Sequence, residues 1–137
     1  MEDTTDKFGV NAGKIWVALN TLGPQNQTLL IKKTKLSNND FYAAIGWLAR
    51  ENKIYKEGSV YRLGETNLTN KIGENAGKIW KTLYSRGEIN ISSIAKITKI
   101  KTYDAYSALG WLARENKIEA NKSSLKSNIL KFKLRYN

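Results

Sequence analysis

An internal repeat is the feature that most constrains how this chain can fold. Two phrases, NAGKIW at residues 11–16 and GWLARENKI at residues 46–54, recur at residues 75–80 and 110–118. Both recur after the same 64 residues, and residues 7–54 are identical to residues 71–118 at about half of their positions, so the register holds without a gap. Self-similarity of this length indicates a duplicated domain. We therefore predict two tandem domains, residues 1–64 and 65–137, with a polar, turn-rich linker at residues 64–70.

Each predicted domain is small. The chain has 137 residues, which excludes a large multidomain enzyme and leaves roughly 60 to 65 residues for each copy. Hydrophobic residues make up 41% of the sequence, which is enough for a packed core. A domain of this size is near the lower limit for folding without disulfides or metal. We therefore expect the two copies to pair within the chain as a pseudo-symmetric unit.

The charge balance is strongly basic. Lys and Arg number 23 against 12 Asp and Glu, which gives a net charge of +11 and an isoelectric point near 9.8. Such a charge attracts polyanions, so nucleic acid is the leading partner class and an acidic membrane surface a distant second. Residues 65–137 carry a net charge of +8, against +3 for residues 1–64. The second copy is therefore the more electropositive one.

The residue types that most enzymes and metal sites use are missing. The chain has no Cys and no His, which removes disulfides, thiol nucleophiles, imidazole bases and Cys/His zinc sites. It also lacks a nucleophile elbow and a Gly-rich phosphate loop, so we expect no enzymatic activity, cofactor or metal. The polar start MEDTTD differs from a signal peptide, and no apolar run approaches the ~20 residues of a membrane span. We expect a cytoplasmic protein, nucleoid-associated if it binds DNA.

Apolar residues in each copy recur at the spacing of amphipathic helices. The inward residues predicted for three helices of copy one are Ala12, Ile15, Trp16 and Leu19; Leu30 and Ile31; and Phe41, Ala44, Ile45 and Leu48. Their counterparts in copy two are Ala76, Ile79, Trp80 and Leu83; Ile94 and Ala95; and Ala105, Ala108, Leu109 and Leu112. Gly23 and Gly87 are expected to close the first helices, and Thr28 and Ser92 to begin the second. The turn before the third helix is expected at residues 35–38 in copy one.

The apolar period changes to two after the third helix of each copy. Residues 54–63 predict a β-hairpin with its turn at residues 57–59. Residues 118–136 predict a second hairpin with a longer loop at residues 121–128. The order helix, short strand, helix, turn, helix, hairpin is that of a winged helix-turn-helix domain. The predicted fold class is α+β, mainly α with small β-hairpin wings, as two tandem winged helix-turn-helix domains.

The two repeated phrases, NAGKIW and GWLARENKI, lie about 30 residues apart in each copy. They resemble a family of short, largely uncharacterised bacterial winged helix-turn-helix proteins that usually carry one such domain. The resemblance covers nearly the whole chain, twice, and is weakest in the wing and the C-terminal strand. It implies DNA binding, which is assigned to that family mainly through its fold. Two copies in one chain depart from the usual form of the family.

The third helix enters the major groove in helix-turn-helix proteins, and its exposed N-terminal residues reach the base edges. The residues predicted at these positions are Ser37, Asn38, Asn39, Asp40, Tyr42 and Ala43 in copy one, and Lys101, Thr102, Tyr103, Asp104, Tyr106 and Ser107 in copy two. Among them Asn38, Asn39, Lys101, Thr102 and Tyr103 are our candidates for nucleic-acid contacts, since Asn pairs with adenine and Lys with guanine or phosphate. The two aspartates would repel DNA and are interpreted as charges that favour a helix N-terminus.

Two further pairs on the third helices have more than one interpretation. Arg50 and Arg114, near the C-terminal ends, either contact phosphate or are solvated surface residues. Trp47 and Trp111 each follow a glycine, Gly46 or Gly110, and a glycine inside a helix costs ~1 kcal/mol relative to Ala.

The Gly-Trp pairs therefore indicate close approach of another group. The tryptophans either pack on their own wing, lie at a contact between copies or chains, or stack on a nucleobase. Trp16 and Trp80 are expected in or near the core.

The last strand carries an alternating pattern of cations. Lys131, Lys133 and Arg135 alternate with apolar residues, which places three positive charges on one strand face. Lys122 and Lys126 are expected in the wing loop beside them. This surface is interpreted as a phosphate-binding wing, with a solvated strand face as the alternative. The hairpin of copy one offers only Lys56 and Arg62 as equivalents.

These observations favour a non-enzymatic protein that binds nucleic acid, most simply duplex DNA, in a transcriptional or architectural role. Cations outnumber residues able to read bases, so contacts to phosphate should dominate and sequence specificity should be low. The alternative from another class is a protein-interaction module that uses the Gly-Trp faces, or an RNA- or ribosome-associated factor. RNA and a homodimer stay open as partners, and the sequence defines neither a target site nor a regulated process.

Overall fold

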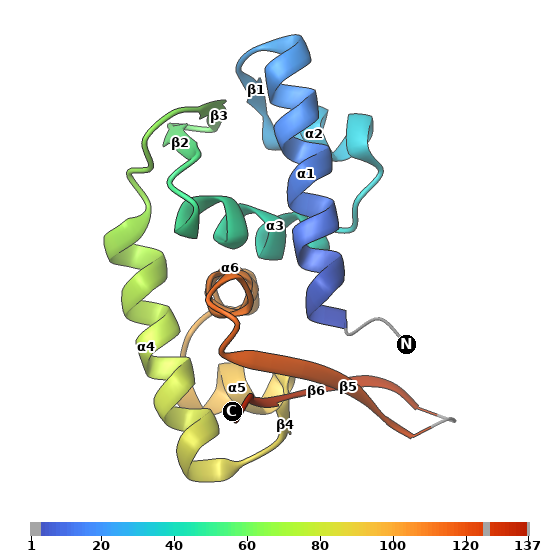
Figure 1. Ribbon diagram of the computed structural model, residues 1–137, viewed down its shortest axis with the longest axis vertical. Helices are drawn as coiled ribbons and strands as arrows, with labels where there is room; N and C mark the ends of the chain where they lie inside the picture. Colours follow the sequence, from blue (N-terminus) through green and yellow to red (C-terminus); the bar gives the residue numbers. More distant parts are fainter. Residues whose placement is uncertain (1–3, 125–126, 137) are drawn as a thin grey trace.

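The computed structural model describes residues 4–124 and 127–136 and has two similar halves (Figure 1). The first half consists of α1 (Thr4–Leu22), β1 (Gln25–Asn26), α2 (Gln27–Thr34), α3 (Asn38–Arg50), β2 (Ile54–Glu57) and β3 (Val60–Leu63). The second half consists of α4 (Thr69–Arg86), β4 (Ile89–Asn90), α5 (Ile91–Thr98), α6 (Thr102–Arg114), β5 (Ile118–Ser124) and β6 (Ser127–Leu134). The two antiparallel sheets have the strand orders β1-β3-β2 and β4-β6-β5. The predicted α+β class with two winged helix-turn-helix repeats is confirmed.

The second helix of each half begins at an asparagine cap. The side-chain oxygen of Asn26 accepts a hydrogen bond from the backbone N–H three residues later, and Asn90 does the same, both at 2.9 Å. The predicted starts at Thr28 and Ser92 are therefore wrong by two residues. Thr and Ser are common caps, but the preceding Asn is at least as good and leaves them inside the first turn.

Backbone conformations with positive φ end the first two helices of each half. Gly23 and Gly87 have φ of 79° and 77°, and each donates its N–H to the carbonyl four residues earlier at 2.9 Å, so they close α1 and α4 as predicted. Lys35 and Lys99 end α2 and α5, both with φ of 60°. The turn before the third helix is therefore built without glycine, although a non-glycine residue in this region is uncommon.

The two wings differ in the length of their strands. In the first wing, β2 and β3 pair from Ile54 with Leu63 to Glu57 with Val60. In the second wing, β5 and β6 continue the ladder well beyond this length, so the long loop predicted at residues 121–128 is wrong. The polar sequence of this segment disfavours a strand, but pairing with a neighbouring strand overrides that preference.

The linker is bound to the first wing. The side chain of Asn67 makes two hydrogen bonds to the backbone of Lys56, accepting from its N–H at 3.0 Å and donating to its carbonyl at 2.6 Å. The backbone N–H of Thr66 donates to the side-chain oxygen of Asn52 at 2.9 Å. The helix α4 begins at Thr69, so the last two residues of the predicted linker belong to the helix. These contacts fix where α4 starts relative to the first half.

Each half contributes a side chain to the hydrophobic core of the other. Phe8 of α1 is 2% exposed and packs in the core of the second half, while Ile72 of α4 is 5% exposed and packs in the core of the first. These two residues occupy equivalent positions in the repeat. Burial of one such side chain stabilises a fold by about 1.5–3 kcal/mol. Neither half therefore completes its core alone.

The third helices α3 and α6 cross at the contact between the halves, which we call the seam (Figure 1). Gly46 lies against the backbone carbonyl of Ser107, and Gly110 lies against that of Ala43. A Cβ atom at either glycine would overlap with the facing carbonyl oxygen. Glycine is needed at both positions because only a residue without a side chain allows two helix backbones to approach so closely.

Trp16 and Trp80 lie at the surface, and their predicted place in the core is wrong. Each is 38% exposed. The buried stripe of α1 includes Phe8, Ala12 and Ile15, and the residue after Ile15 is rotated by about 100° from its centre. A bulky aromatic beside an apolar stripe is thus easily assigned to the core from sequence alone.

The seam predicts a strong difference between two helix glycines. Replacing Gly46 by Ala should destabilise the chain by about 1–3 kcal/mol or more, because the added methyl group overlaps with the Ser107 carbonyl. Gly13, inside α1, has no atom within 4 Å of an added Cβ, so Gly13→Ala should stabilise by up to about 1 kcal/mol. Urea denaturation followed by circular dichroism measures both changes. Equal effects of the two substitutions would contradict this description of the seam.

Candidate nucleic-acid interface

The face of the third helix that usually enters the major groove is partly covered by the other half. Ala43 is fully buried, and Tyr106 and Ser107 are only 8% and 6% exposed. Tyr42 is half-buried. The prediction that these four residues are exposed toward bases is therefore wrong. These residues are covered because α3 and α6 cross at Gly46 and Gly110. An isolated helix-turn-helix domain has no such second helix, so the prediction left these residues exposed.

The N-terminal ends of the two third helices stay accessible and lie on one side of the molecule. The rings of Tyr42 and Tyr103 stack with centroids 4.9 Å apart near these ends, while Arg50 contacts Glu115 near the C-terminal ends. The two helices cross steeply at the seam, and these two contacts lie on either side of the crossing (Figure 1). The candidate residues at the accessible ends are Asn38, Asn39, Lys101, Thr102 and Tyr103, and all five are exposed.

Arg50 and Arg114 form reciprocal ion pairs across the seam. The Nε atom of Arg50 lies 3.1 Å from Oε2 of Glu115, and that of Arg114 lies 3.0 Å from Oε2 of Glu51. Each arginine side chain is 46% exposed. Both of our sequence interpretations, a phosphate contact and a simply solvated residue, omitted this intramolecular partner. Because a carboxylate already balances each guanidinium, these arginines are weaker candidates for phosphate contacts than the sequence indicated.

The tryptophans of the Gly-Trp pairs also lie beside the seam. A Cβ atom at Gly9 of α1 would be 2.7 Å from the Trp47 ring, so Trp47 packs directly on the first helix of its own half. The guanidinium of Arg114 lies 5.9 Å from the centre of the Trp47 ring, and that of Arg50 lies 5.6 Å from the centre of the Trp111 ring. Of the three alternatives, these contacts match a position between the copies and not a contact with the wing.

Lysines at the helix-turn-helix turns form a cationic surface, of which the sequence analysis identified only Lys101. We call these residues the turn lysines: Lys32, Lys33 and Lys35 in the first half, and Lys96, Lys99 and Lys101 in the second. All six are exposed, and no ion pair with a carboxylate is found for them in residues 4–124 and 127–136. These lysines lie in or next to the predicted turn, so their positions in the sequence already indicate a cationic surface there.

The cations of the second wing are partly neutralised. The Nζ atom of Lys133 lies 3.1 Å from Oε1 of Glu119, and Nε of Arg135 lies 4.0 Å from Oε2 of the same carboxylate. The hydrogen bond to Glu119 raises the pKa of Lys133 above its ordinary value. Lys131 is half-buried on the same strand face. Within the described residues, one carboxylate is thus shared by two of the three cations in this row.

The two lysines expected beside that row are placed differently. Lys122 pairs with Leu130 in the ladder, whereas Lys131 pairs with Asn121. Because side chains alternate along a strand, Lys122 projects from the opposite face of the sheet to Lys131. The prediction that Lys122 extends the same cationic row is therefore wrong, and it lies in β5 instead of a loop. Lys126 lies outside the described residues.

Both cations of the first wing lie over aromatic rings. The guanidinium of Arg62 is 4.1 Å from the centre of the Tyr55 ring, and the Nζ atom of Lys56 is 5.5 Å from that of Tyr61. Burial raises the pKa of Tyr61 to about 12, so this ring stays neutral at physiological pH. Contacts with the two tyrosine rings therefore hold Lys56 and Arg62 in place, and no ion pair between either cation and a carboxylate is found in the described residues.

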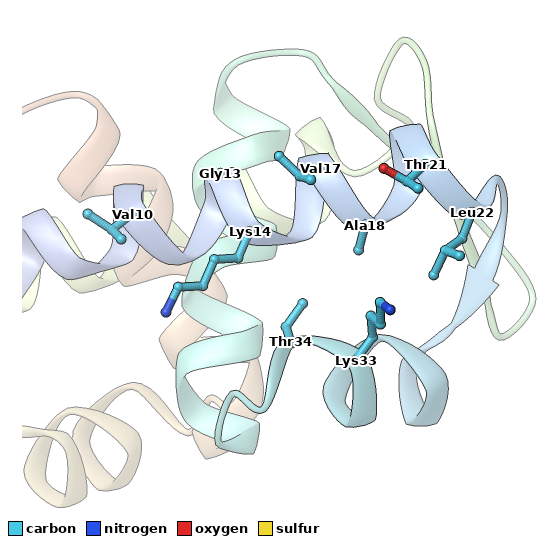
Figure 2. A pocket seen from close by; sticks show the side chains of 9 residues that line it. All are labelled: Val10, Gly13, Lys14, Val17, Ala18, Thr21, Leu22, Lys33 and Thr34. Atoms are coloured by element: carbon cyan, nitrogen blue, oxygen red, sulfur yellow. The ribbon is translucent and has the colours of Figure 1, made fainter.

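An open apolar hollow lies between α1 and the C-terminal part of α2 (Figure 2). It has a volume of about 600 Å³, and Val10, Val17 and Leu22 contribute exposed apolar surface to it. The equivalent residues of the second half are Glu74, Lys81 and Arg86. Because these are charged, the hollow cannot represent a function common to both repeats.

Two searches of the described residues gave negative results. Within residues 4–124 and 127–136, no cluster of three or more acidic side chains is arranged to hold a metal ion. No helix in that part of the chain is long and apolar enough to cross a membrane.

Comparisons with known proteins agree with the duplicated architecture. The sequence model of the Winged helix-turn-helix domain (DUF2582) family matches the chain twice, at residues 1–63 and 67–131. An uncharacterised protein of the archaeon Methanocaldococcus jannaschii is 49% identical over 51 residues, which cover 35% of this chain and 71% of that protein. No solved structure matches the chain. The family resemblance is confirmed, but the bacterial source that it implied is not, because this relative is archaeal.

The reciprocal ion pairs predict equal coupling energies on the two sides of the seam. A double-mutant cycle with Arg114→Ala and Glu51→Ala should give a coupling of about 0.2–1 kcal/mol, because both side chains are partly solvated. The cycle with Arg50→Ala and Glu115→Ala is the matched control and should give the same value within error. Urea denaturation measures both. A coupling near zero in one cycle alone would contradict the pseudo-symmetric seam.

Proposed function

This chain belongs to the Winged helix-turn-helix domain (DUF2582) family in both of its halves, and we propose that it binds duplex DNA through phosphate-dominated contacts. The winged helix-turn-helix domain is in general a DNA-binding domain, and it acts by binding instead of by catalysis. The net charge of +11 supports a polyanionic partner. The observation that carries the proposal is the group of exposed turn lysines at the helix-turn-helix turns of both halves.

The seam determines the mode of binding that we propose. Burial of Ala43, Tyr106 and Ser107 prevents α3 and α6 from inserting their covered faces into a major groove. The accessible helix ends and the turn lysines lie beside each other in each half, because the turns directly precede α3 and α6. DNA would therefore contact these two turns along its phosphate backbone, and few side chains would reach the bases.

The two wings add to this surface in unequal amounts. Lys131 and Lys133 offer a second set of phosphate contacts, although Glu119 competes for Lys133 and Arg135. In the first wing Lys56 and Arg62 lie over tyrosine rings. We propose that the second half contributes more affinity than the first, since its net charge is +8 against +3.

Low sequence specificity follows from this arrangement. Specific recognition usually depends on side chains that make paired hydrogen bonds to base edges in the major groove. Here only Asn38 and Asn39 supply such amides at an accessible helix end, and the equivalent residues of the second half are Thr102 and Tyr103. The two halves would therefore not read the same base sequence. An architectural or broadly acting transcriptional role fits these properties better than recognition of a palindromic operator.

The Gly-Trp faces are poor candidates for docking another protein. Gly46 and Gly110 each contact the backbone of the opposite helix, so these faces are already occupied within the chain. This removes the main feature that favoured a protein-interaction module. DNA binding is therefore the function that the geometry supports best.

A salt titration with duplex DNA tests the proposal. If the protein contacts about five phosphates, the logarithm of the binding constant should fall with the logarithm of salt concentration at a slope of roughly −4 to −5. Two unrelated duplexes of equal length should bind with nearly equal affinity. Fluorescence anisotropy with labelled duplex, single-stranded DNA and structured RNA gives both quantities. Tighter binding to RNA, or no binding to duplex at low salt, would contradict the proposal.

Charge-matched variants locate the DNA-binding lysines within the same experiment. Lys99→Ser with Lys101→Ser should reduce the slope by about 0.9 for each phosphate that the protein no longer neutralises. Lys14→Ser with Lys78→Ser removes the same charge from α1 and α4 and should leave the slope nearly unchanged.

The wings are compared in the same way. The triple change of Lys131, Lys133 and Arg135 to Ser should weaken binding more than Lys56→Ser with Arg62→Ser. Equal weakening by these two variants would show that the second wing is only a solvated surface.

A further inference from the structure

The residues that the two repeats share include several that internal packing does not explain. Gly46 is needed at the seam, and Asn52, two residues after the end of α3, has a φ of 60°, which Asn tolerates well. Gly77 is different, because an added Cβ there would meet nothing within 4 Å. Trp80 is 38% exposed, as is its counterpart Trp16. An unneeded helix glycine and an exposed tryptophan have thus been retained in both copies, at positions only three residues apart.

These residues line a pocket that occurs once in each half. We call the pocket of the second half, between α4 and the C-terminal end of α6, the tryptophan pocket; Trp80 and Trp111 both line it, with Gly77 between them on the helix surface. The pocket of the first half is lined by residues at the same nine positions of the repeat. Eight of the nine are identical, compared with about half of the positions over the repeat as a whole. The exception is Val17 in the first half, which is Lys81 in the second.

The shape and composition of the tryptophan pocket fit a flat heteroaromatic ring. Its volume is about 330 Å³, at the lower end for a small-molecule site. The Trp80 ring stacks on Tyr84 with the centroids 5.4 Å apart, and the Arg50 guanidinium lies 5.6 Å from the centre of the Trp111 ring, so a ligand would stack on the opposite faces of these indoles. A glycine lets a planar group lie close to the helix backbone. The carboxylate of Glu115 and the ammonium of Lys117 lie at the wall and supply hydrogen-bonding groups of both kinds. A nucleobase has this combination of a flat ring with donors and acceptors at its edge.

A cationic hollow adjoins the tryptophan pocket. It has a volume of about 600 Å³, is lined by Arg50, Arg114 and Lys117, and shares Lys117 and Glu115 with the pocket. Lys81 adds a fourth positive charge on the pocket side. Glu115 and Glu51 balance two of these charges through the seam ion pairs, which leaves an excess of two positive charges. Because the two guanidiniums are already paired, the ammonium of Lys81, for which no ion pair is found in the described residues, is the strongest candidate for a direct phosphate contact, and the net positive charge of the hollow favours an anion beside it.

We propose that the second half binds a nucleotide, with its base in the tryptophan pocket against Trp80 and Trp111 and its phosphates in the adjoining cationic hollow. The site lies at the C-terminal ends of α3 and α6, opposite to the N-terminal ends proposed to face DNA. It is therefore a separate site for a small ligand, and it does not depend on whether the protein binds DNA. The equivalent pocket of the first half should bind an anion more weakly, because it has Val17 in place of the positively charged Lys81.

Isothermal titration of the full chain with ATP, adenosine and inorganic tripolyphosphate tests this proposal. ATP should bind saturably, and adenosine and tripolyphosphate should each bind at least tenfold more weakly, because each can make only one half of the interactions. Trp80→Ala should weaken ATP binding roughly fivefold or more, which is the usual effect of removing one stacking ring, and should leave tripolyphosphate binding unchanged. Lys81→Val should weaken ATP binding severalfold while the fold, measured by circular dichroism, stays intact.

Trp16→Ala is the matched control, because it removes the equivalent ring from the first half. It should change ATP binding less than twofold. Equal binding of ATP and tripolyphosphate would show a general anion effect and overturn the proposal. The proposal is also overturned if ATP does not bind, or if Trp16→Ala and Trp80→Ala have equal effects. Because Lys81→Val copies a residue that the first half already carries at this position, it tests the site even if Trp80→Ala impairs folding.

Discussion

The contact between α3 and α6 at Gly46 and Gly110 is the constraint on which the rest of the structure depends. Two helix backbones approach at these glycines more closely than any side chain would allow. This approach brings Arg50 to Glu115 and Arg114 to Glu51, and it sets the distance at which Phe8 and Ile72 reach the opposite cores. The duplication therefore yields one cooperative unit whose halves complete each other, as two subunits of a dimer would.

The same contact limits how the protein can recognise DNA. An isolated winged helix-turn-helix domain presents its third helix to the major groove. In this chain part of that helix surface lies in the seam, so the turns, helix ends and wings are the surfaces left for DNA. Lysines dominate at the turns, and a contact between lysine and phosphate does not depend on the base sequence. If the protein binds DNA as proposed, affinity without strong specificity would be the physical consequence of using the third helices to hold the two halves together.

The sequence predicted the fold well because the repeat and the helical periodicity are local signals. Phe41, Ala44, Ile45 and Leu48 are buried as predicted, since an apolar stripe specifies which side of a helix faces a core. The seam was harder to predict, because a Gly-Trp pair indicates close approach without identifying the partner. The cross-seam pairing of Arg50 was missed for a related reason: it depends on a residue 65 positions away.

The candidate site was predicted less completely than the fold. Lys122 was expected in a loop beside the cationic row, but it lies in a strand, where side chains alternate and its own projects from the opposite face to Lys131. Of the turn lysines only Lys101 was a candidate from the sequence, because charge alone does not distinguish a free lysine from a paired one. Lys133 and Lys99 look alike in the sequence, yet only the former lies beside a carboxylate in the described residues. Such distinctions depend on tertiary structure.

The central claim is that the two halves fold as one unit through the seam. Fluorine NMR of the chain labelled with 5-fluorotryptophan tests it directly. Of the signals from its four tryptophans, those of Trp16 on α1 and Trp80 on α4, assigned by substitution, report on the two halves separately. During a urea titration both signals should lose their native intensity at the same midpoint and with the same steepness. Separate midpoints for Trp16 and Trp80 would show that the halves unfold independently, which would contradict the account.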